Sequence, residues 1–429
     1  MSYQNHLSRR GLFRSLASCA ALGSLGSLAA VSQQARAAAS ERKFLFFFAE
    51  GGWDPTPLDP KFGADGVSAV GGTDMDPGTF LGQAGNLTYS AGDDRPNMDL
   101  FFQNWGQRAA LVRGVNVHSV AHDTATQWMM TGSTSMTAPD WPTILASSGG
   151  SYPMPHLVFS GPNFPGRLGA AVVRGGGGSL LQLIDGSLLS YADTNSPQHA
   201  LSVDSMIDAH VHRQGVRYQQ ELQGLAKVRA DAFIESLNRG SELEGRQFEA
   251  GLGASQSGTL DQALMALEVM RLGLTRCAMI QIPGSWDTHG GNGGVGPQLD
   301  DFFGVLDQVM DHCNRTPGFS QSWLADEVTI VCASELGRTP MFNGAGGRDH
   351  WTYASMMMMG SGIRGDTVAG ATTDSFIARE CDFGTGQPSA SGGIIGTENV
   401  GAALLQLGGA DASRYLPGVA PLTAIIEGE

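Results

Sequence analysis

One short stretch of the chain, Asp287-Thr288-His289, places an acid and an imidazole directly after an apolar run. In an extended segment alternate residues face the same way, so the Asp287 carboxylate and the His289 imidazole are predicted to share one side. This pair suits zinc, iron, manganese or, with further oxygen ligands, calcium. The same residues also fit a turn with an Asx hydrogen bond and a surface histidine. The motif alone leaves both interpretations open.

A second stretch has the same layout, with polar residues after the apolar run at 328–332. Glu335 is a candidate metal ligand or base, or an acid favoured at a helix N-terminus. Arg338 is a candidate bidentate clamp for an anionic group, or a partner that neutralises Glu335. Asp349 and His350 are candidate ligands that follow a glycine-rich loop, whose glycines permit close backbone approach. An ordinary loop with a charged tip has the same composition.

Two further strand ends carry candidate groups. Glu50 and Asp54 follow the first apolar run and add carboxylates at that edge. Ser119 and Thr124 lie just before or at the start of a predicted helix at 124–131, which Gly132 is expected to end. Either hydroxyl is a candidate nucleophile beside a base or metal, and either also fits a helix cap.

The elements that must position these residues alternate along the chain. Buried strands are predicted at 42–49, 109–115, 277–282 and 328–332, and helices at 260–275 and 300–314. This alternation is typical of βαβ units, so we expect an α/β fold with a largely parallel central sheet flanked by helices. In such sheets the chemistry gathers past the carboxyl ends of the strands. Residues 55–96 are expected to form an elaborated loop, and about 200–255 a helical insertion or cap.

Composition narrows the class of partner. The chain has a formal net charge of −15, which disfavours nucleic acid or an anionic membrane surface as the main partner. Sixty glycines point to many loops and turns rather than a helical bundle.

The N-terminus has the pattern of an export signal. Arg9-Arg10 precedes a weakly apolar stretch and a small-residue cleavage site at 35–37, which together predict a twin-arginine signal peptide at 1–37. A short membrane-anchoring helix is the alternative. Cleavage would remove four arginines and no acid, changing the net charge from −15 to −19. Since no other stretch is long and apolar enough to span a membrane, we expect a periplasmic or extracellular protein whose single α/β domain occupies 38–429. The remaining cysteines, Cys277, Cys313, Cys332 and Cys381, permit disulfides but do not require them.

Several motifs together carry a resemblance. The chain contains Trp286-Asp287-Thr288-His289, then the run from Ser334 to Pro340, and then Gly347-Arg348-Asp349-His350. In this order they resemble the GWDTH, SEFGR(T) and GTDHG patterns of the family known as domain of unknown function 1501. That family is similar to a divergent branch of the alkaline phosphatase/sulfatase superfamily. The chain departs from the patterns at Ser285, Leu336 and Arg348, which replace Gly, Phe and Thr.

The resemblance implies divalent metal ions at the strand ends. Asp287, His289 and His350 would correspond to the ligands of one metal, and Glu335 with Glu50 or Asp54 to the carboxylates of a second. Where sulfatase-like enzymes carry a Cys or Ser nucleophile this chain has His122, as is usual in the family. Ser119 or Thr124 could replace that nucleophile, or a metal-bound water could attack directly.

The sequence therefore predicts an exported, metal-dependent hydrolase of phosphate or sulfate esters, acting on a small-molecule or polymer-borne anionic ester. Zinc, calcium and manganese are the candidate ions. The alternative is a non-catalytic exported protein that uses the same scaffold for binding or assembly. Acyl-ester hydrolysis is disfavoured because the chain has no G-x-S-x-G motif.

Overall fold

The fold is built on one eight-stranded sheet. The computed structural model describes residues 41–175, 201–243 and 258–428, so the predicted signal peptide lies outside the described residues. The strand order across the sheet is β12-β4-β11-β8-β1-β7-β5-β6. The strands are β1 (Lys43–Ala49), β4 (Ala109–Asn116), β5 (His156–Val158), β6 (Val172–Arg174), β7 (Cys277–Gln281), β8 (Val328–Ser334), β11 (Tyr353–Gly360) and β12 (Thr367–Ala369). All pairings are parallel except those of β11, which runs antiparallel to β4 and β8. The predicted α/β class with a largely parallel sheet is confirmed.

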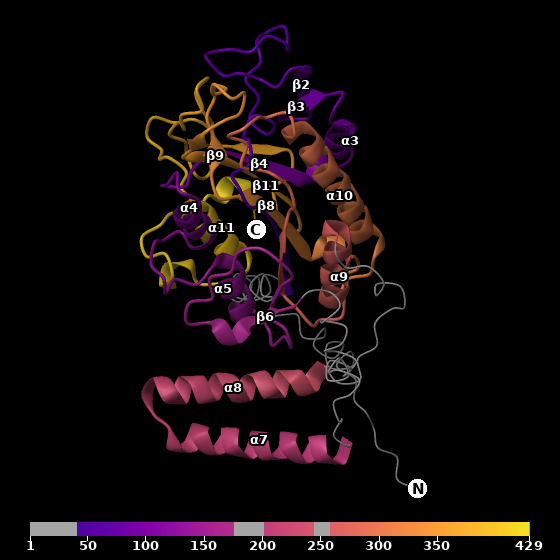
Figure 1. Cartoon of the computed structure of the whole chain (residues 1–429), viewed down its shortest axis with the longest axis vertical. Helices are drawn as coiled ribbons and strands as arrows, with labels where there is room; N and C mark the ends of the chain where they lie inside the picture. The colour runs from indigo at the N-terminus through magenta and orange to yellow at the C-terminus, as the bar shows by residue number, and fades with distance from the viewer. Residues whose placement is uncertain (1–40, 176–200, 244–257, 429) are drawn as a thin grey trace, which may run out of the picture.

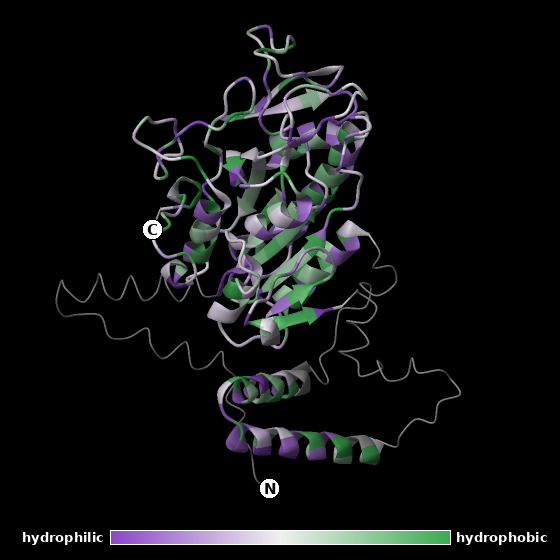
Figure 2. Ribbon diagram, turned by 60° about the vertical axis from the view of Figure 1, so that its left-hand side comes forward, coloured by the Kyte–Doolittle hydropathy of each residue, from purple (hydrophilic) through white to green (hydrophobic). Residues whose placement is uncertain are grey.

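Strand β1 is the centre of the sheet and is buried on both sides. Phe44, Phe46 and Phe48 point into one core, whereas Leu45 and Phe47 point into the other. Alternate side chains of a strand face opposite sides of the sheet, so an unbroken apolar run is what a two-sided buried strand requires. In Figure 2 the strands are the most hydrophobic part of the molecule. The sequence KFLFFFA thus fixes β1 between two helical layers.

Helices cover both faces of the sheet (Figure 1). One face packs against α4 (His122–Thr131), α5 (Trp141–Ser148) and α11 (Thr397–Leu407). The other packs against α3 (Pro96–Trp105), α9 (Thr259–Arg271) and α10 (Val295–Arg315). As expected, α4 ends at Gly132, whose φ of 62° lets its N–H bond the Trp128 carbonyl oxygen.

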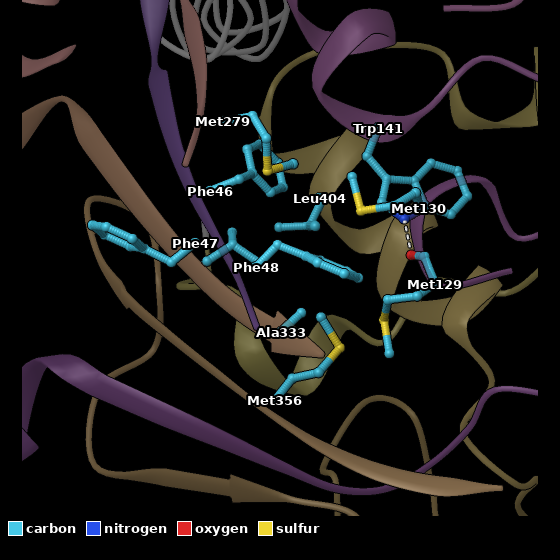
Figure 3. Close-up of a pocket in the computed structure, with 11 residues that line it drawn as sticks. Phe46, Phe47, Phe48, Met129, Met130, Trp141, Met279, Ala333, Met356 and Leu404 are labelled. Atoms are coloured by element: carbon cyan, nitrogen blue, oxygen red, sulfur yellow. Dashed lines mark hydrogen bonds between the residues drawn. The ribbon is translucent and has the colours of Figure 1, made fainter. Parts of the chain in front are cut away.

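Methionine fills much of the core on the α4 face. Met129, Met279 and Met356 surround a small apolar cavity beside Phe46 and Phe48 (Figure 3). Methionine is unbranched and adapts to irregular gaps, so it suits a core built from large aromatic side chains.

One feature of the fold differs from expectation. Residues 55–96 contain a two-stranded hairpin of β2 (Thr79–Ala84) and β3 (Leu87–Gly92), where a loop was predicted. A run of four methionines, Met356 to Met359, lies in β11 and is buried in the core. Methionine has no strong preference for strands, so only the long-range pairing with β4 and β8 makes this run a strand.

Residues 201–243 form a helical hairpin that stands apart from the sheet. It comprises α7 (Leu201–Glu221) and α8 (Gly224–Leu243), and α8 touches the short 3-10 helix at Gly169–Ala171 next to β6. In Figure 1 the hairpin lies at the bottom of the view, well away from β9 (Gly337–Arg338). The expectation that about 200–255 form a helical insertion or cap stays a prediction. Among the described residues no helix combines the length and apolarity that a membrane span requires.

The four cysteines of the described chain are all free and buried. Burial raises the pKa of the Cys277 and Cys313 thiols to about 12, because the thiolate would lose its hydration. These residues therefore serve as small apolar groups of the core.

His156 makes the stability of this fold depend on pH. It is fully buried in β5, where its Nδ1 lies 2.9 Å from the Thr143 hydroxyl of α5. Burial lowers the pKa of the imidazole to about 3, so the folded state keeps it neutral while the unfolded state takes up a proton below about pH 6.5. Its contribution is complete above pH 6.5 and is lost as the pH falls from 6.5 towards 3.

We predict that His156→Gln will flatten this acid dependence. Wild type should lose about 2 kcal/mol more than the variant between pH 8 and pH 5, since one pKa unit corresponds to about 1.4 kcal/mol. Urea unfolding at the two pH values measures the difference. Identical pH dependence in both proteins would contradict the prediction.

Candidate metal centre

The ends of three neighbouring strands form the floor of the candidate site. β1 lies between β8 and β7, with Ala49 opposite Ser334 and Phe48 opposite Gln281. The segments that follow these strands therefore leave the sheet at the same edge. They carry Gly51 after β1, Asp287 after β7 and Glu335 after β8.

Three imidazoles and one carboxylate meet above this edge. His122 begins α4, Asp287 and His289 follow β7, and His350 begins β10 (His350–Trp351). The Asp287 carboxylate oxygens lie 3.6 Å from His122 Nε2, 3.4 Å from His289 Nε2 and 3.7 Å from His350 Nε2. Ligand-type atoms of His122, Asp287 and His350 all lie within 4.8 Å of one another. In addition, the Nε2 atoms of His289 and His350 lie 2.9 Å apart.

The outer nitrogen of each ring is held by an acceptor. His122 Nδ1 lies 2.6 Å from Glu335 Oε1, and His289 Nδ1 lies 2.7 Å from Asp349 Oδ1. His350 Nδ1 lies 2.6 Å from the Val120 carbonyl oxygen. A carbonyl or an ionised carboxylate can only accept, so these contacts place a hydrogen on each Nδ1; in the neutral form of the rings each Nε2 would then present its lone pair inwards. Burial lowers the pKa of His350, which favours the neutral ring.

This arrangement fits a cation. With both rings in that form, the Nε2 lone pairs of His289 and His350 would face each other across 2.9 Å and repel unless a proton or a metal cation lay between or beside them. His122 Nε2 is buried and has no hydrogen-bond partner. A divalent ion would satisfy all of these atoms, and imidazole nitrogens with one carboxylate are a donor set typical of zinc and other transition metals. Calcium prefers six to eight oxygen ligands, so the donor set disfavours it.

Asp287 is kept ionised by a buried arginine. Its partial burial acts to raise its pKa, but the Arg338 guanidinium, 2.8 Å from Oδ1, outweighs that effect and holds the pKa below its usual range. Half of the Asp287 side chain is exposed, at 51%, and His289 is 44% exposed. The cluster is therefore open to solvent and to a molecule arriving from it.

Arg338 itself is not placed as an anion clamp. It is fully buried and donates to the carbonyl oxygens of Gly51, Gly52 (2.7 Å) and Arg348 (3.1 Å), besides Asp287. These contacts direct the guanidinium into the protein. They hold the loops around the cluster, and the predicted catalytic role of Arg338 stays a prediction.

Glu335 also differs from expectation, because it lies behind His122 rather than among the converging atoms. Its Oε1 accepts from His122 Nδ1 and, at 2.7 Å, from the Gly51 N–H, and its Oε2 lies 3.1 Å from the Ser334 hydroxyl. The side chain is fully buried. Both oxygens are used in this way and Glu335 holds the His122 ring, while its predicted role as a ligand stays a prediction.

The other predicted site residues lie outside the cluster or at its border. Asp349 holds His289 and accepts from Asn343 at 3.0 Å, so it too orients a ring. Asp54 is buried against Arg348 at 2.7 Å, and exposed Glu50 accepts from Gln281 at 2.8 Å.

Neither predicted hydroxyl nucleophile is held at the cluster. Ser119 bonds only to the backbone of Ala121, at 3.1 and 3.4 Å. Thr124 is exposed on α4.

The sequence did not predict the Val120 carbonyl oxygen as the partner of His350, since no side-chain pattern indicates a backbone acceptor.

A glycine brings the two halves of the cluster together. A Cβ on Gly347 would overlap the carbonyl oxygens of Thr288 and His289, so this loop can approach the His289 segment only without a side chain. Gly344, in the same loop, has open space around it.

We predict that Gly347→Ala will lower the free energy of unfolding by about 1–3 kcal/mol, the usual effect of forcing an extra carbon into a packed contact. Gly344→Ala is the matched control and should be nearly neutral. Urea denaturation of both variants beside wild type makes the comparison. Equal stability of the two variants would show that the loop approaches less closely than the structure indicates.

The fold and the cluster define an α/β protein with a histidine- and carboxylate-rich centre at the carboxyl edge of a largely parallel sheet. The chain belongs to the family described as "Protein of unknown function (DUF1501)", whose model matches residues 53–380. This confirms the family that the motifs indicated. No curated protein matches the sequence.

Three solved structures show a distant likeness at 10% identity. The protein Ps i-CgsB in complex with k-i-k-neocarrahexaose has a TM-score of 0.37, with 88% of this chain and 74% of that one covered. A putative sulfatase from Bacteroides thetaiotaomicron has a TM-score of 0.35, with 90% and 74% covered. A protein in complex with its substrate D-glucosamine-2-N,6-O-disulfate has a TM-score of 0.34, with 90% and 80% covered. At these scores the chemistry must be argued from the residues themselves.

Proposed function

We propose that this protein is an exported, metal-dependent hydrolase of phosphate or sulfate esters. The observation that carries the proposal is the convergence of inward-facing imidazole nitrogens on the Asp287 carboxylate, with His289 and His350 only 2.9 Å apart. Such a set offers a divalent cation several donor atoms at once, and its position past the strand ends is where α/β enzymes bind ligands. Export follows from the twin-arginine pattern in residues 1–37.

The residues of the centre have two roles: some would bind the ion, and others orient the residues that bind it. Asp287, His289 and His350 would hold the ion, and Asp349 and the Val120 carbonyl fix the two rings. When bound, a zinc- or manganese-like ion supplies Lewis-acid stabilisation of the charge on a transferring phosphoryl or sulfuryl group. Arg338 keeps Asp287 ionised and in place.

The substrate class follows from the family resemblance and from the openness of the site. Because Asp287 and His289 are about half exposed, the centre is open to an ester carried on a polymer as well as to a small molecule. The guanidinium of Arg338 faces inwards, so the ion would be the main positive charge that an anionic ester meets there.

A second candidate function is non-catalytic binding or assembly on the same scaffold. It is favoured by the apolar side chains of the α7–α8 hairpin, where Met206 is 71% exposed, Leu225 76% and Val228 58%. Exposed apolar side chains that gather into one patch mark interaction surfaces. The two functions differ in what the histidine cluster must do, since only the hydrolase needs it to bind metal.

We predict that the mature protein, purified without chelator, will contain about one equivalent of zinc or manganese. The Asp287→Ala/His350→Ala double variant should lose it, because two of the converging groups are gone. Glu50→Ala is the control: it removes an acid from the same edge but not from the cluster, and should retain the metal. Elemental analysis gives the result directly.

The same proteins test turnover. With p-nitrophenyl phosphate and p-nitrophenyl sulfate as probes, the double variant should be at least about 100-fold slower than wild type, since losing even a supporting partner of a metal ligand costs about 10–100-fold. If wild type contains no metal, even after zinc and manganese are added back, the proposed hydrolase function is contradicted and binding is left as the function.

A further inference from the structure

His122 occupies the place where a covalent nucleophile was expected, yet its surroundings are those of a metal ligand. Its ring edge meets His350, with centroids 4.4 Å apart and planes at 79°. Its Nδ1 forms a hydrogen bond with Glu335 Oε1, 2.6 Å away. Its Nε2 is buried, lacks a hydrogen-bond partner and lies 3.6 Å from Asp287 Oδ2. A buried lone pair without a donor is costly unless a cation binds it.

Glu335 supplies the second, independent observation. A fully buried carboxylate needs a compensating positive charge. The guanidinium of Arg338 is directed to Asp287 and to backbone carbonyls instead. The strong contacts of Glu335 are to His122 Nδ1 and the Gly51 N–H. Positive charge therefore reaches Glu335 most directly through the His122 ring, as in carboxylate–histidine–metal arrangements.

We propose that His122 is a fourth protein ligand of the centre and that Glu335 is the residue that positions it. This rests on the metal-dependent function proposed above and adds a role for His122 within it. Once the Nε2 lone pair is used for the ion, it is not available to form a phosphoryl- or sulfuryl-histidine. The ester is then cleaved in one displacement: the water oxygen joins the phosphorus or sulfur, the bond to the leaving oxygen breaks, and a water proton ends on the released alcohol.

The test measures metal binding to the full mature protein, apart from activity. Zinc affinity is determined by competition with a chelator, and the ligand set is followed by the visible spectrum of the cobalt(II)-loaded protein. His122→Ala should weaken zinc binding by more than about 100-fold and change the cobalt spectrum. Glu335→Gln should weaken zinc binding by about 10–100-fold, as loss of a supporting carboxylate does, with the cobalt bands nearly in place. Added imidazole should restore part of the affinity of His122→Ala.

His118→Asn is the matched control. His118 lies in the same loop and also pairs with a carboxylate, Glu398 at 3.1 Å, but outside the cluster. Asparagine tolerates the positive φ of 58° at this position, so the variant should keep wild-type zinc affinity. Circular dichroism of the metal-free proteins checks that each variant is folded.

The outcomes separate this inference from the function on which it rests. If wild type binds zinc and His122→Ala retains both the affinity and the cobalt spectrum, His122 is not a ligand and the inference fails alone. Detection of a phosphoryl- or sulfuryl-histidine at position 122 by mass spectrometry after rapid quenching would also overturn it. If wild type binds no metal, the proposed function fails and the role of His122 fails with it.

Discussion

The site depends first on the buried guanidinium of Arg338. An arginine carries five N–H donors and keeps its charge, so it can be buried only where the protein supplies acceptors for it. Here the acceptors are the carbonyls of Gly51 and Gly52 after β1, that of Arg348 before β10, and the carboxylate of Asp287 after β7. One side chain, that of Arg338 in β9, thereby joins the segments that carry the cluster. The residue that the motif suggests as a substrate clamp is the one that makes the centre rigid.

The topology of the sheet explains why these segments meet at all. His122 and Glu335 are 213 positions apart in the chain, yet their side chains are in contact. They meet because β11 joins β4 to β8 across the sheet, which brings the loop after β4 beside the end of β8. The hydrogen bond from Val117 N to the Thr352 carbonyl oxygen, 2.9 Å long, holds that loop next to β10 and β11. The antiparallel strand is therefore what closes the cluster from the α4 side.

Much of the framework is predictable from the sequence, because it depends on local patterns. The apolar runs of β1, β7 and β8 are long enough to be recognised, and Gly132 ends α4 through its own backbone preference. The partners of the polar residues are not predictable in this way. Glu335 and Asp54 are both acids after a strand, but one faces an imidazole and the other a buried arginine, and only long-range packing decides which. The same holds for β11, whose methionines carry no strand signal of their own.

Those pairings also bear on the number of ions that the centre can take. The family resemblance implies a second metal held by Glu335 with Glu50 or Asp54. In the structure Glu335 is bonded to His122 and the Gly51 N–H, and Asp54 to Arg348 at 2.7 Å. To recruit either acid, a second ion would have to break a buried charged contact and leave its former partner unpaired, a change that typically costs several kcal/mol. Glu50 is free of that cost, but it lies at the exposed rim and is bonded to Gln281. These contacts support the proposal of a single ion where the three imidazoles meet Asp287, with Glu335 and Asp349 acting through the rings they orient.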